Sequence, residues 1–147
     1  MASLRTNLNP FMEKVVMYLQ QCPDVAAAYL FGSYARGTER QGSDIDIAVL
    51  FYNLKDKLVR FDRRLEMIMD LEGIVVGRKV DVVDIEEAPL LLQHYILKEG
   101  ILLVDKEPRY RISFEVKSRR SYFDLRPLLV KRGQRIIERV LGGILSD

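Results

Sequence analysis

The sequence predicts an α/β (α+β) protein, in which helices flank a mixed sheet and a helical element follows at the C-terminus. Apolar runs of strand length alternate with segments whose apolar residues recur at helical spacing. The predicted order is helix, strand, strand, helix, strand, helix and then further helices. This order is typical of a sheet covered by helices.

Length and composition indicate one domain over residues 1–147, with a core over 1–104 and C-terminal helices over 105–147. The chain has 147 residues, of which 48% are hydrophobic and 30% charged, a balance typical of a folded globular protein. It has no apolar secretion signal, and no apolar run approaches the roughly 18 residues that span a bilayer. Cys22, the single cysteine, fits a reducing compartment. We therefore expect a cytoplasmic protein.

The first elements are a helix and two strands. Asn9 before Pro10 predicts the start of a helix, which ends before Cys22. Its apolar residues recur at helical spacing: Phe11, Val15, Tyr18 and Leu19. The short apolar runs 25–31 and 44–51 predict strands.

The middle of the chain predicts a long helix and two further strands. Asn53 can cap a helix that ends at Gly73, with these residues facing the core: Leu54, Leu58, Phe61, Leu65 and Ile68. Residues 74–76 and 79–85 predict strands, joined by a turn at 77–78.

The last third predicts helices around one short strand. A helix runs from Pro89 to about Lys98, and a strand follows over 101–104. Another helix begins at Pro108, and Pro127 is expected to break or kink it, because proline lacks the N–H that a helix interior needs.

The charge is unevenly distributed. The net charge is +2, but the segment 106–141 carries 11 Lys and Arg against 4 Asp and Glu. A basic C-terminal third beside an acidic body favours a phosphate-rich ligand, a nucleic acid or an acidic protein partner. Helices with solvated charged faces would give the same pattern.

Two carboxylates lie on one face of the second predicted strand. Asp44 and Asp46 are two residues apart, so their side chains share a face about 6 to 7 Å apart. Like charges this close resist burial unless a cation lies between them. Oxygen ligands suit hard divalent ions, of which magnesium accompanies nucleotide phosphates. The pair therefore predicts a magnesium site.

A possible anion site lies upstream of this pair. Gly32 ends the first strand, and Ser33 could begin a short helix whose free N–H groups bind phosphate. Glycine also allows close approach of the backbone to a ligand. Arg36 lies one helical turn further, where it either reaches the same phosphates or remains a surface cation.

A third carboxylate is needed if two metal ions are to be held. Asp81 and Asp84 lie three residues apart in the third main strand, so only one of them can face the pair. Asp81 is favoured because it lies in the middle of that strand. Asp84 lies near its end, where exposure to solvent would explain an acidic residue.

At this point the sequence resembles the polymerase-beta-like nucleotidyltransferases. Their signature joins a strand, Gly-Ser, about ten residues and Asp-x-Asp, which stands here as LFGSYARGTERQGSDIDIAVLF, followed by VDVVDI. The resemblance covers residues 25–85 clearly and 86–147 more loosely. Within the superfamily, the chain is similar to the minimal nucleotidyltransferases, in particular the MntA-type antitoxins paired with HEPN-domain toxins.

The resemblance implies a fold, a reaction and a set of site residues. The fold would be a nucleotidyltransferase fold, and the reaction would transfer AMP from ATP to a tyrosine of a HEPN RNase toxin, which silences it. Gly32 and Ser33 would hold the triphosphate. Asp44 and Asp46 would bind two Mg²⁺ ions, and Asp81 would complete the ion on the attacking side and help to deprotonate the incoming hydroxyl. A stable complex with the toxin is implied, without membrane or direct nucleic-acid binding.

Two other functions compete with this one. The protein could modify a small hydroxylated molecule such as an aminoglycoside, although about 60 C-terminal residues leave little room for an acceptor domain. It could also neutralise its partner by binding alone, although the intact carboxylates argue against a complete loss of catalysis.

Overall fold

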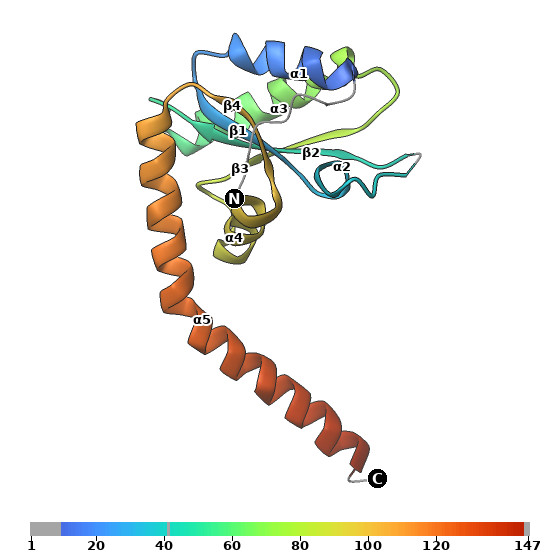
Figure 1. The fold of residues 1–147 in the computed structure, drawn as a ribbon, viewed down its shortest axis with the longest axis vertical. Helices are drawn as coiled ribbons and strands as arrows, with labels where there is room; N and C mark the ends of the chain where they lie inside the picture. The colour runs from blue at the N-terminus through green and yellow to red at the C-terminus, as the bar shows by residue number, and fades with distance from the viewer. Residues whose placement is uncertain (1–9, 41, 146–147) are drawn as a thin grey trace.

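The computed structural model describes residues 10–40 and 42–145, in which a four-stranded sheet is surrounded by helices (Figure 1). The strands are β1 (Val25–Phe31), β2 (Ile45–Phe51), β3 (Val80–Asp84) and β4 (Ile101–Asp105). The helices are α1 (Pro10–Gln20), α2 (Ser33–Arg36), α3 (Lys57–Ile74), α4 (Leu90–Glu99) and α5 (Pro108–Leu145). Asn9, the predicted cap of α1, lies outside the described residues.

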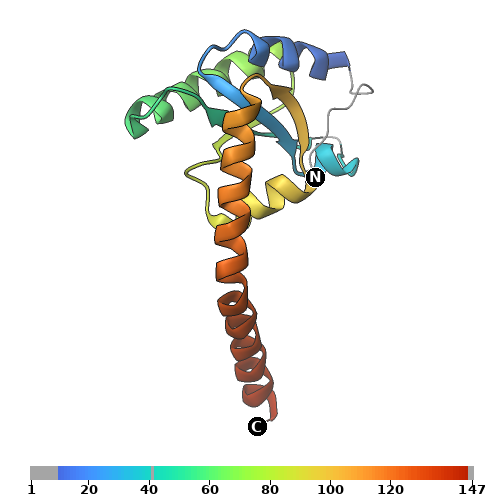
Figure 2. The same cartoon turned by 60° about the vertical axis from the view of Figure 1, so that its left-hand side comes forward.

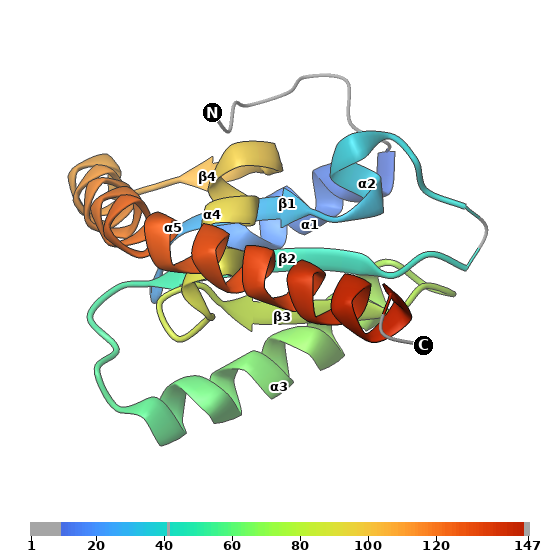
Figure 3. The ribbon, with the colours of Figure 1, turned by 90° about the horizontal axis from the view of Figure 1, so that it is seen from below.

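The sheet is mixed, as the sequence predicts. Its strands lie in the order β3-β2-β1-β4. Strand β1 is antiparallel to β2 and β4, whereas β2 and β3 are parallel. Helices α1 and α3 cover one face, and α4 with the first part of α5 lies on the other (Figures 1 and 3). The mixed sheet and its flanking helices confirm the predicted fold class.

Strand β1 forms the centre of the core. All seven of its residues are buried, because helices cover the sheet on both sides. Ala28 and Leu30 pack in the cluster with α1 and α3, whereas Tyr29 and Phe31 pack in the cluster with α4. The uninterrupted apolar run at 25–31 therefore reflects burial on both faces.

Helix α3 begins later than the sequence predicts. Asn53 has a φ of 58°, in the left-handed region, and lies in the loop before the helix. The cap is Asp56, whose carboxylate accepts hydrogen bonds from the N–H groups of Leu58 and Val59 at 2.9 and 3.3 Å. The predicted cap at Asn53 is therefore wrong.

The predicted core face of α3 is also wrong in its central part. Leu58, Phe61 and Leu65 are exposed, with 77%, 52% and 47% of their surface accessible. The buried apolar residues are Met67 and Leu71. Two residues of the predicted set, Leu54 and Ile68, are half-buried against the core. Apolar residues occur on two sides of this helix, so spacing alone does not select the buried side.

Arginines on α3 fix its rotation about its axis. Arg63 Nε donates to Asp24 Oδ2 at 2.7 Å, and Arg64 Nε donates to the carbonyl of Val82 at 2.9 Å. These bonds turn the arginine side of the helix toward the body of the protein. The apolar residues on the other side consequently face outward.

A buried ion pair joins α3 to the end of β3. The Nε atom of Arg60 lies 3.1 Å from Asp84 Oδ2, but its N–H is not directed at an acceptor, so this contact is an ion pair without a hydrogen bond. Nη2 of the same arginine donates to Glu87 Oε1 at 2.6 Å. Both Arg60 and Asp84 are buried. Asp84 is therefore not the exposed strand-end residue that the sequence suggests.

The predicted strand at 74–76 is absent. Ile74 is the last residue of α3, and the next residues form a turn in which Gly77 has a φ of 88°. The helix thus runs one residue past Gly73, which was its predicted end. The turn at 77–78 and the strand after it are as predicted.

Helix α5 continues through Pro127 instead of breaking there. It runs for 38 residues, and its ribbon bends near the middle (Figure 1). Proline cannot donate to the carbonyl four residues earlier, which belongs to Phe123. Phe123 and Asp124 are exposed, so water can satisfy this carbonyl. The C-terminal part of the helix extends away from the sheet (Figure 2).

No helix in residues 10–40 and 42–145 is long and apolar enough to cross a membrane.

We expect Arg60→Leu to lower the free energy of unfolding by about 3 kcal/mol near neutral pH, because it leaves the buried Asp84 carboxylate without its cation. Burial already raises the pKa of the Asp84 carboxyl, and Arg60 is the main group that opposes this rise. A carboxyl with a raised pKa destabilises the fold while it is ionised. The loss should therefore shrink as the pH falls toward about 5.

Urea denaturation at both pH values measures this effect. The matched control is the double variant Arg60→Leu with Asp84→Asn, which removes the carboxylate and should lose the extra pH dependence. A single variant as stable as the wild type at both pH values would contradict this account of the pair.

Candidate functional site

The parallel pairing of β2 with β3 places two carboxylates side by side. Asp46 is the register partner of Asp81, and neighbouring strands lie about 4.8 Å apart. Ala48 and Val83, two residues further along each strand, pack in the cluster beneath α4. Because side chains alternate along a strand, Asp46 and Asp81 face the same side of the sheet as α4.

Asp44 lies just before this pair, and together they form the carboxylate cluster of Asp44, Asp46 and Asp81. Strand β2 begins at Ile45, one residue later than predicted. Asp46 is half-buried, whereas Asp44 and Asp81 are exposed. Burial, followed by the charges of Asp81 and Asp44, raises the pKa of the Asp46 carboxyl. The three residues are thus close enough for their negative charges to act on one another.

No cation balances the carboxylate cluster within the described residues. None of its three members makes an ion pair with Lys, Arg or His there. In the same residues, no group of three or more His, Cys, Asp or Glu side chains is arranged to hold a metal ion. The backbone thus brings the cluster together, but its side chains do not form a ready ligand set. By charge and donor type, the cluster suits a hard divalent cation.

Asp84 does not belong to this cluster. It lies three residues after Asp81, faces the α3 side of the sheet and pairs with Arg60. Opposite orientations for the two aspartates are what the sequence predicts. The buried pair with Arg60 accounts for Asp84, which leaves Asp81 as the third member of the cluster.

The backbone of Gly32 lies directly against the Asp46 carboxylate. Phe31, the last residue of β1, pairs with Asp46, so the chain turns just beside it. Gly32 has a φ of 78° and a ψ of −156°, a combination that is essentially restricted to glycine. A β-carbon at this position would overlap Asp46 Oδ2. The turn therefore requires glycine, and a side chain at this position would displace the Asp46 carboxylate.

Ser33 begins α2, which is a single turn of helix. The backbone N–H of Arg36 donates to the Gly32 carbonyl at 3.2 Å, and that of Thr38 donates to the Ser33 carbonyl at 2.9 Å. Gly37 ends the helix in the left-handed conformation. The chain after Gly32 thus forms one helical turn and ends it at Gly37, so Ser33 remains beside the end of β1.

Arg36 projects from α2 toward α4. Its Nη1 donates to the hydroxyl of Tyr95 at 2.8 Å, which joins the two helices. Arg36 is exposed and makes no ion pair among the described residues. Tyr95 was not predicted as part of the site, because no sequence pattern connects residues 59 positions apart.

The chain is similar to proteins of one known family. Residues 13–109 match the family described as Polymerase beta, Nucleotidyltransferase. Among curated proteins, protein adenylyltransferase MntA of Shewanella oneidensis is 33% identical over 88 residues. That alignment covers 59% of this chain and 60% of the relative, so the chain spans less than two thirds of MntA.

Solved structures of toxin–antitoxin complexes contain similar chains. One, a crystal structure of a toxin-antitoxin with AMP-PNP, matches with a TM-score of 0.66 and 31% identity, covering 88% of this chain and 98% of that chain. Another contains a tri-AMPylated Shewanella oneidensis HEPN toxin with an MNT antitoxin, and matches with a TM-score of 0.61 and 29% identity, covering 89% and 96%. The family match at residues 13–109 spans more than half of this chain, so the chain belongs to the polymerase beta nucleotidyltransferase family.

Proposed function

We propose that this protein is an antitoxin that transfers AMP from ATP to a tyrosine hydroxyl of a HEPN-domain toxin. The observation that carries the proposal is the cluster of Asp44, Asp46 and Asp81, which has no balancing cation among the described residues and whose Asp46 lies against the backbone of Gly32. A nucleotidyltransferase needs such a cluster next to a phosphate site. The relationship to MntA and to the antitoxin bound to an AMPylated HEPN toxin supports the choice of donor and acceptor.

Two Mg²⁺ ions are proposed as cofactors. Asp44 and Asp46 would hold both ions, and Asp81 would complete the one on the attacking side. When bound, these ions would offset the negative charge of the phosphates and favour ionisation of the acceptor hydroxyl. The raised pKa of Asp46 supports this assignment, because a half-buried carboxylate among like charges is stabilised by a nearby cation.

The phosphate-binding residues are proposed to be Gly32, Ser33 and Arg36. Gly32 has no side chain and allows the triphosphate to approach the turn after β1. Ser33 would contribute its hydroxyl and its N–H group. The hydrogen bond from Arg36 to Tyr95 uses one of the five guanidinium donors, so the other donors could bind phosphate oxygens.

The proposed reaction is a substitution at the α-phosphorus of ATP. The tyrosine oxygen forms a bond to this phosphorus, and the bond from the phosphorus to the diphosphate leaving group breaks. The hydroxyl proton passes to the Asp81 carboxylate. A tyrosine hydroxyl has a pKa near 10, so a nearby base is needed at neutral pH. The protein contributes chiefly by holding donor and acceptor in position.

Intact-mass measurement tests this function directly. The protein is incubated with ATP, Mg²⁺ and the product of the neighbouring gene as the candidate partner, and both chains are weighed. We expect the partner to gain one or more AMP units and to lose its RNase activity. Asp46→Asn should abolish the gain, while its thermal midpoint without Mg²⁺ stays unchanged or rises, because the substitution removes a repelled negative charge.

Three outcomes would contradict the proposal. Near-wild-type AMP transfer by Asp46→Asn would exclude a metal role for this carboxylate. Tight binding of the partner without any change in mass would indicate neutralisation by occlusion. Modification of a small hydroxylated molecule, with the partner unchanged, would indicate a different acceptor class.

Substitution of Gly32 tests its contact with Asp46. We expect Gly32→Ala to reduce AMP transfer at least about a hundredfold, because the added carbon must displace the Asp46 carboxylate. Its positive φ should also cost about 1 to 3 kcal/mol of stability.

The matched control is Gly37→Ala in the same segment. Gly37 also has a positive φ, of 71°, but a β-carbon there would meet no atom within 4 Å. This variant should lose about 1 kcal/mol of stability and keep AMP transfer within about threefold of the wild type. Equal losses of activity in the two variants would mean that backbone strain, and not the carboxylate contact, is responsible.

A further inference from the structure

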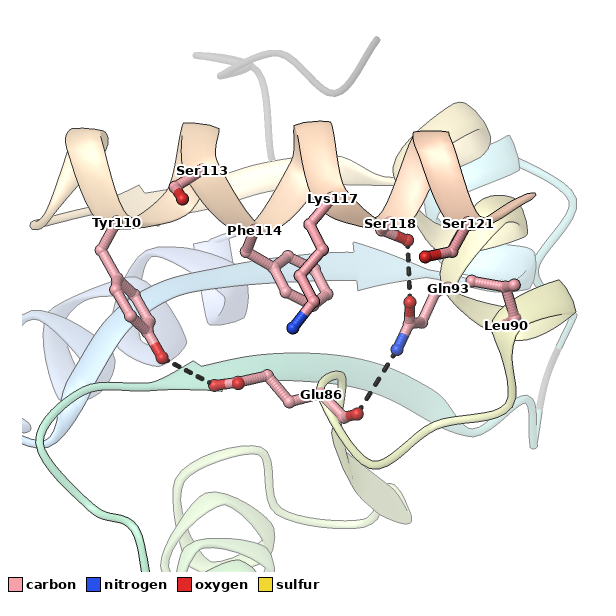
Figure 4. Close-up of a pocket in the computed structure, with 9 residues that line it drawn as sticks. All are labelled: Glu86, Leu90, Gln93, Tyr110, Ser113, Phe114, Lys117, Ser118 and Ser121. Carbon is pink, nitrogen blue, oxygen red and sulfur yellow. Dashed lines mark hydrogen bonds between the residues drawn. The ribbon is translucent and has the colours of Figure 1, made fainter. Parts of the chain in front are cut away.

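A pocket of about 450 Å³ opens between the β3–α4 loop, α4 and the first half of α5 (Figure 4). This pocket, called here the α4–α5 pocket, contains none of the residues assigned to the AMP-transfer site. Its volume lies within the range of about 300 to 1,000 Å³ that is usual for binding pockets. The proposed reaction leaves it without a role.

The walls of the α4–α5 pocket are held by hydrogen bonds. The buried side chain of Gln93 donates to the carbonyl of Ile85 at 2.9 Å and accepts from Ser118 Oγ at 2.8 Å. At the opposite end, the hydroxyl of Tyr110 donates to Glu86 Oε1 at 3.0 Å (Figure 4). These bonds connect the loop, α4 and α5, so the pocket is formed before any ligand arrives.

Other polar groups of the pocket remain available. The Nζ atom of Lys117 projects between the two walls (Figure 4) and makes no hydrogen bond or ion pair within the described part of the chain. The hydroxyls of Ser113 and Ser121 also line the pocket. Phe114 and Leu90 provide apolar surface beside them. A cation and hydroxyls next to apolar surface suit a ligand that joins a carboxylate to an apolar group.

The pocket lies on the same side of the sheet as the carboxylate cluster. Its residue Phe114 packs in the same cluster as Ala48, which follows Asp46 on that face. Strand β1 points toward the end of the pocket lined by Gln93 and Ser121 (Figure 4), and the last residue of β1 pairs with Asp46. The pocket and the proposed AMP-transfer site therefore lie on the same side of the sheet, with this end of the pocket directed toward the site.

The distance between the two sites suits a peptide. Glu86 follows Asp81 by five residues, the last two of which lie in the turn after β3, so the two positions are at most about 17 Å apart at roughly 3.3 Å per residue. An extended polypeptide covers this distance in four or five residues. An acceptor polypeptide whose hydroxyl reaches the carboxylate cluster would thus place a side chain four or five residues away in the pocket.

We propose that the α4–α5 pocket binds the acceptor polypeptide, at a side chain four or five residues from the modified hydroxyl. The segment bound there presents an acidic side chain to Lys117 and an apolar side chain to Phe114 and Leu90. The inference rests on the proposed function, because it assumes that the acceptor is a polypeptide. Glu86 at the far end disfavours the triphosphate of ATP as the occupant.

Steady-state kinetics with the product of the neighbouring gene as the partner test this pocket. We expect Lys117→Glu to raise KM for the partner at least about tenfold, while KM for ATP and kcat stay within about twofold. Lys117→Arg keeps the cation and should behave like the wild type. Arg120→Glu makes the same change of charge on an exposed position of α5 outside the pocket, and should leave both KM values unchanged.

A second variant, Ser121→Trp, fills the end of the pocket without changing its charge and should raise KM for the partner in the same way. Unchanged KM for the partner in both variants would overturn the proposal. So would a rise in KM for ATP, because the pocket would then belong to the nucleotide.

A binding measurement separates this proposal from the proposed function. If the wild type transfers no AMP, the proposed function fails, but the dissociation constant for the HEPN-domain protein can still be measured. A tenfold weaker complex with Lys117→Glu, and not with Arg120→Glu, would then support the pocket as a docking site. Equal affinities of both variants would reject it.

Discussion

The parallel pairing of β2 with β3 is the constraint on which the candidate site depends. It aligns Asp46 with Asp81 on one face of the sheet and leaves their charges without a partner among the described residues. The same alternation sends Asp84 to the opposite face, where Arg60 compensates its buried charge. Two strands thus separate an acidic residue whose buried charge is paired within the fold from acidic residues whose charges have no such partner among the described residues.

The surroundings of the carboxylate cluster serve it in different ways. Gly32 brings bare backbone against Asp46, in a conformation that other residues rarely adopt. Arg36, on the helix that follows Gly32, is held by a hydrogen bond from α2 to Tyr95 on α4. On the same side of the sheet, α5 closes the pocket that contains Lys117. Helices α2, α4 and α5 therefore determine which protein groups could contact a nucleotide and an acceptor.

Much of the fold could be predicted from the sequence, since β1 and α4 follow from local signals such as an apolar run and a proline before a helix. The pair Asp44 and Asp46 was also found by spacing. The spacing of apolar residues did not predict which side of α3 is buried, because tertiary contacts determine it. Arg63 and Arg64 bond to residues far away in the sequence, and Phe61 is exposed. Tyr95 could not be predicted, because its hydrogen bond to Arg36 depends on the tertiary arrangement of α2 and α4.

Anomalous diffraction from a crystal grown with Mn²⁺ and a non-hydrolysable ATP analogue tests the central claim most directly. The account predicts two manganese peaks within bonding distance of carboxylate oxygens of Asp44, Asp46 and Asp81, with the triphosphate against Gly32 and Ser33. Manganese bound elsewhere, or a nucleotide seated in the α4–α5 pocket with the three carboxylates free of metal, would contradict it.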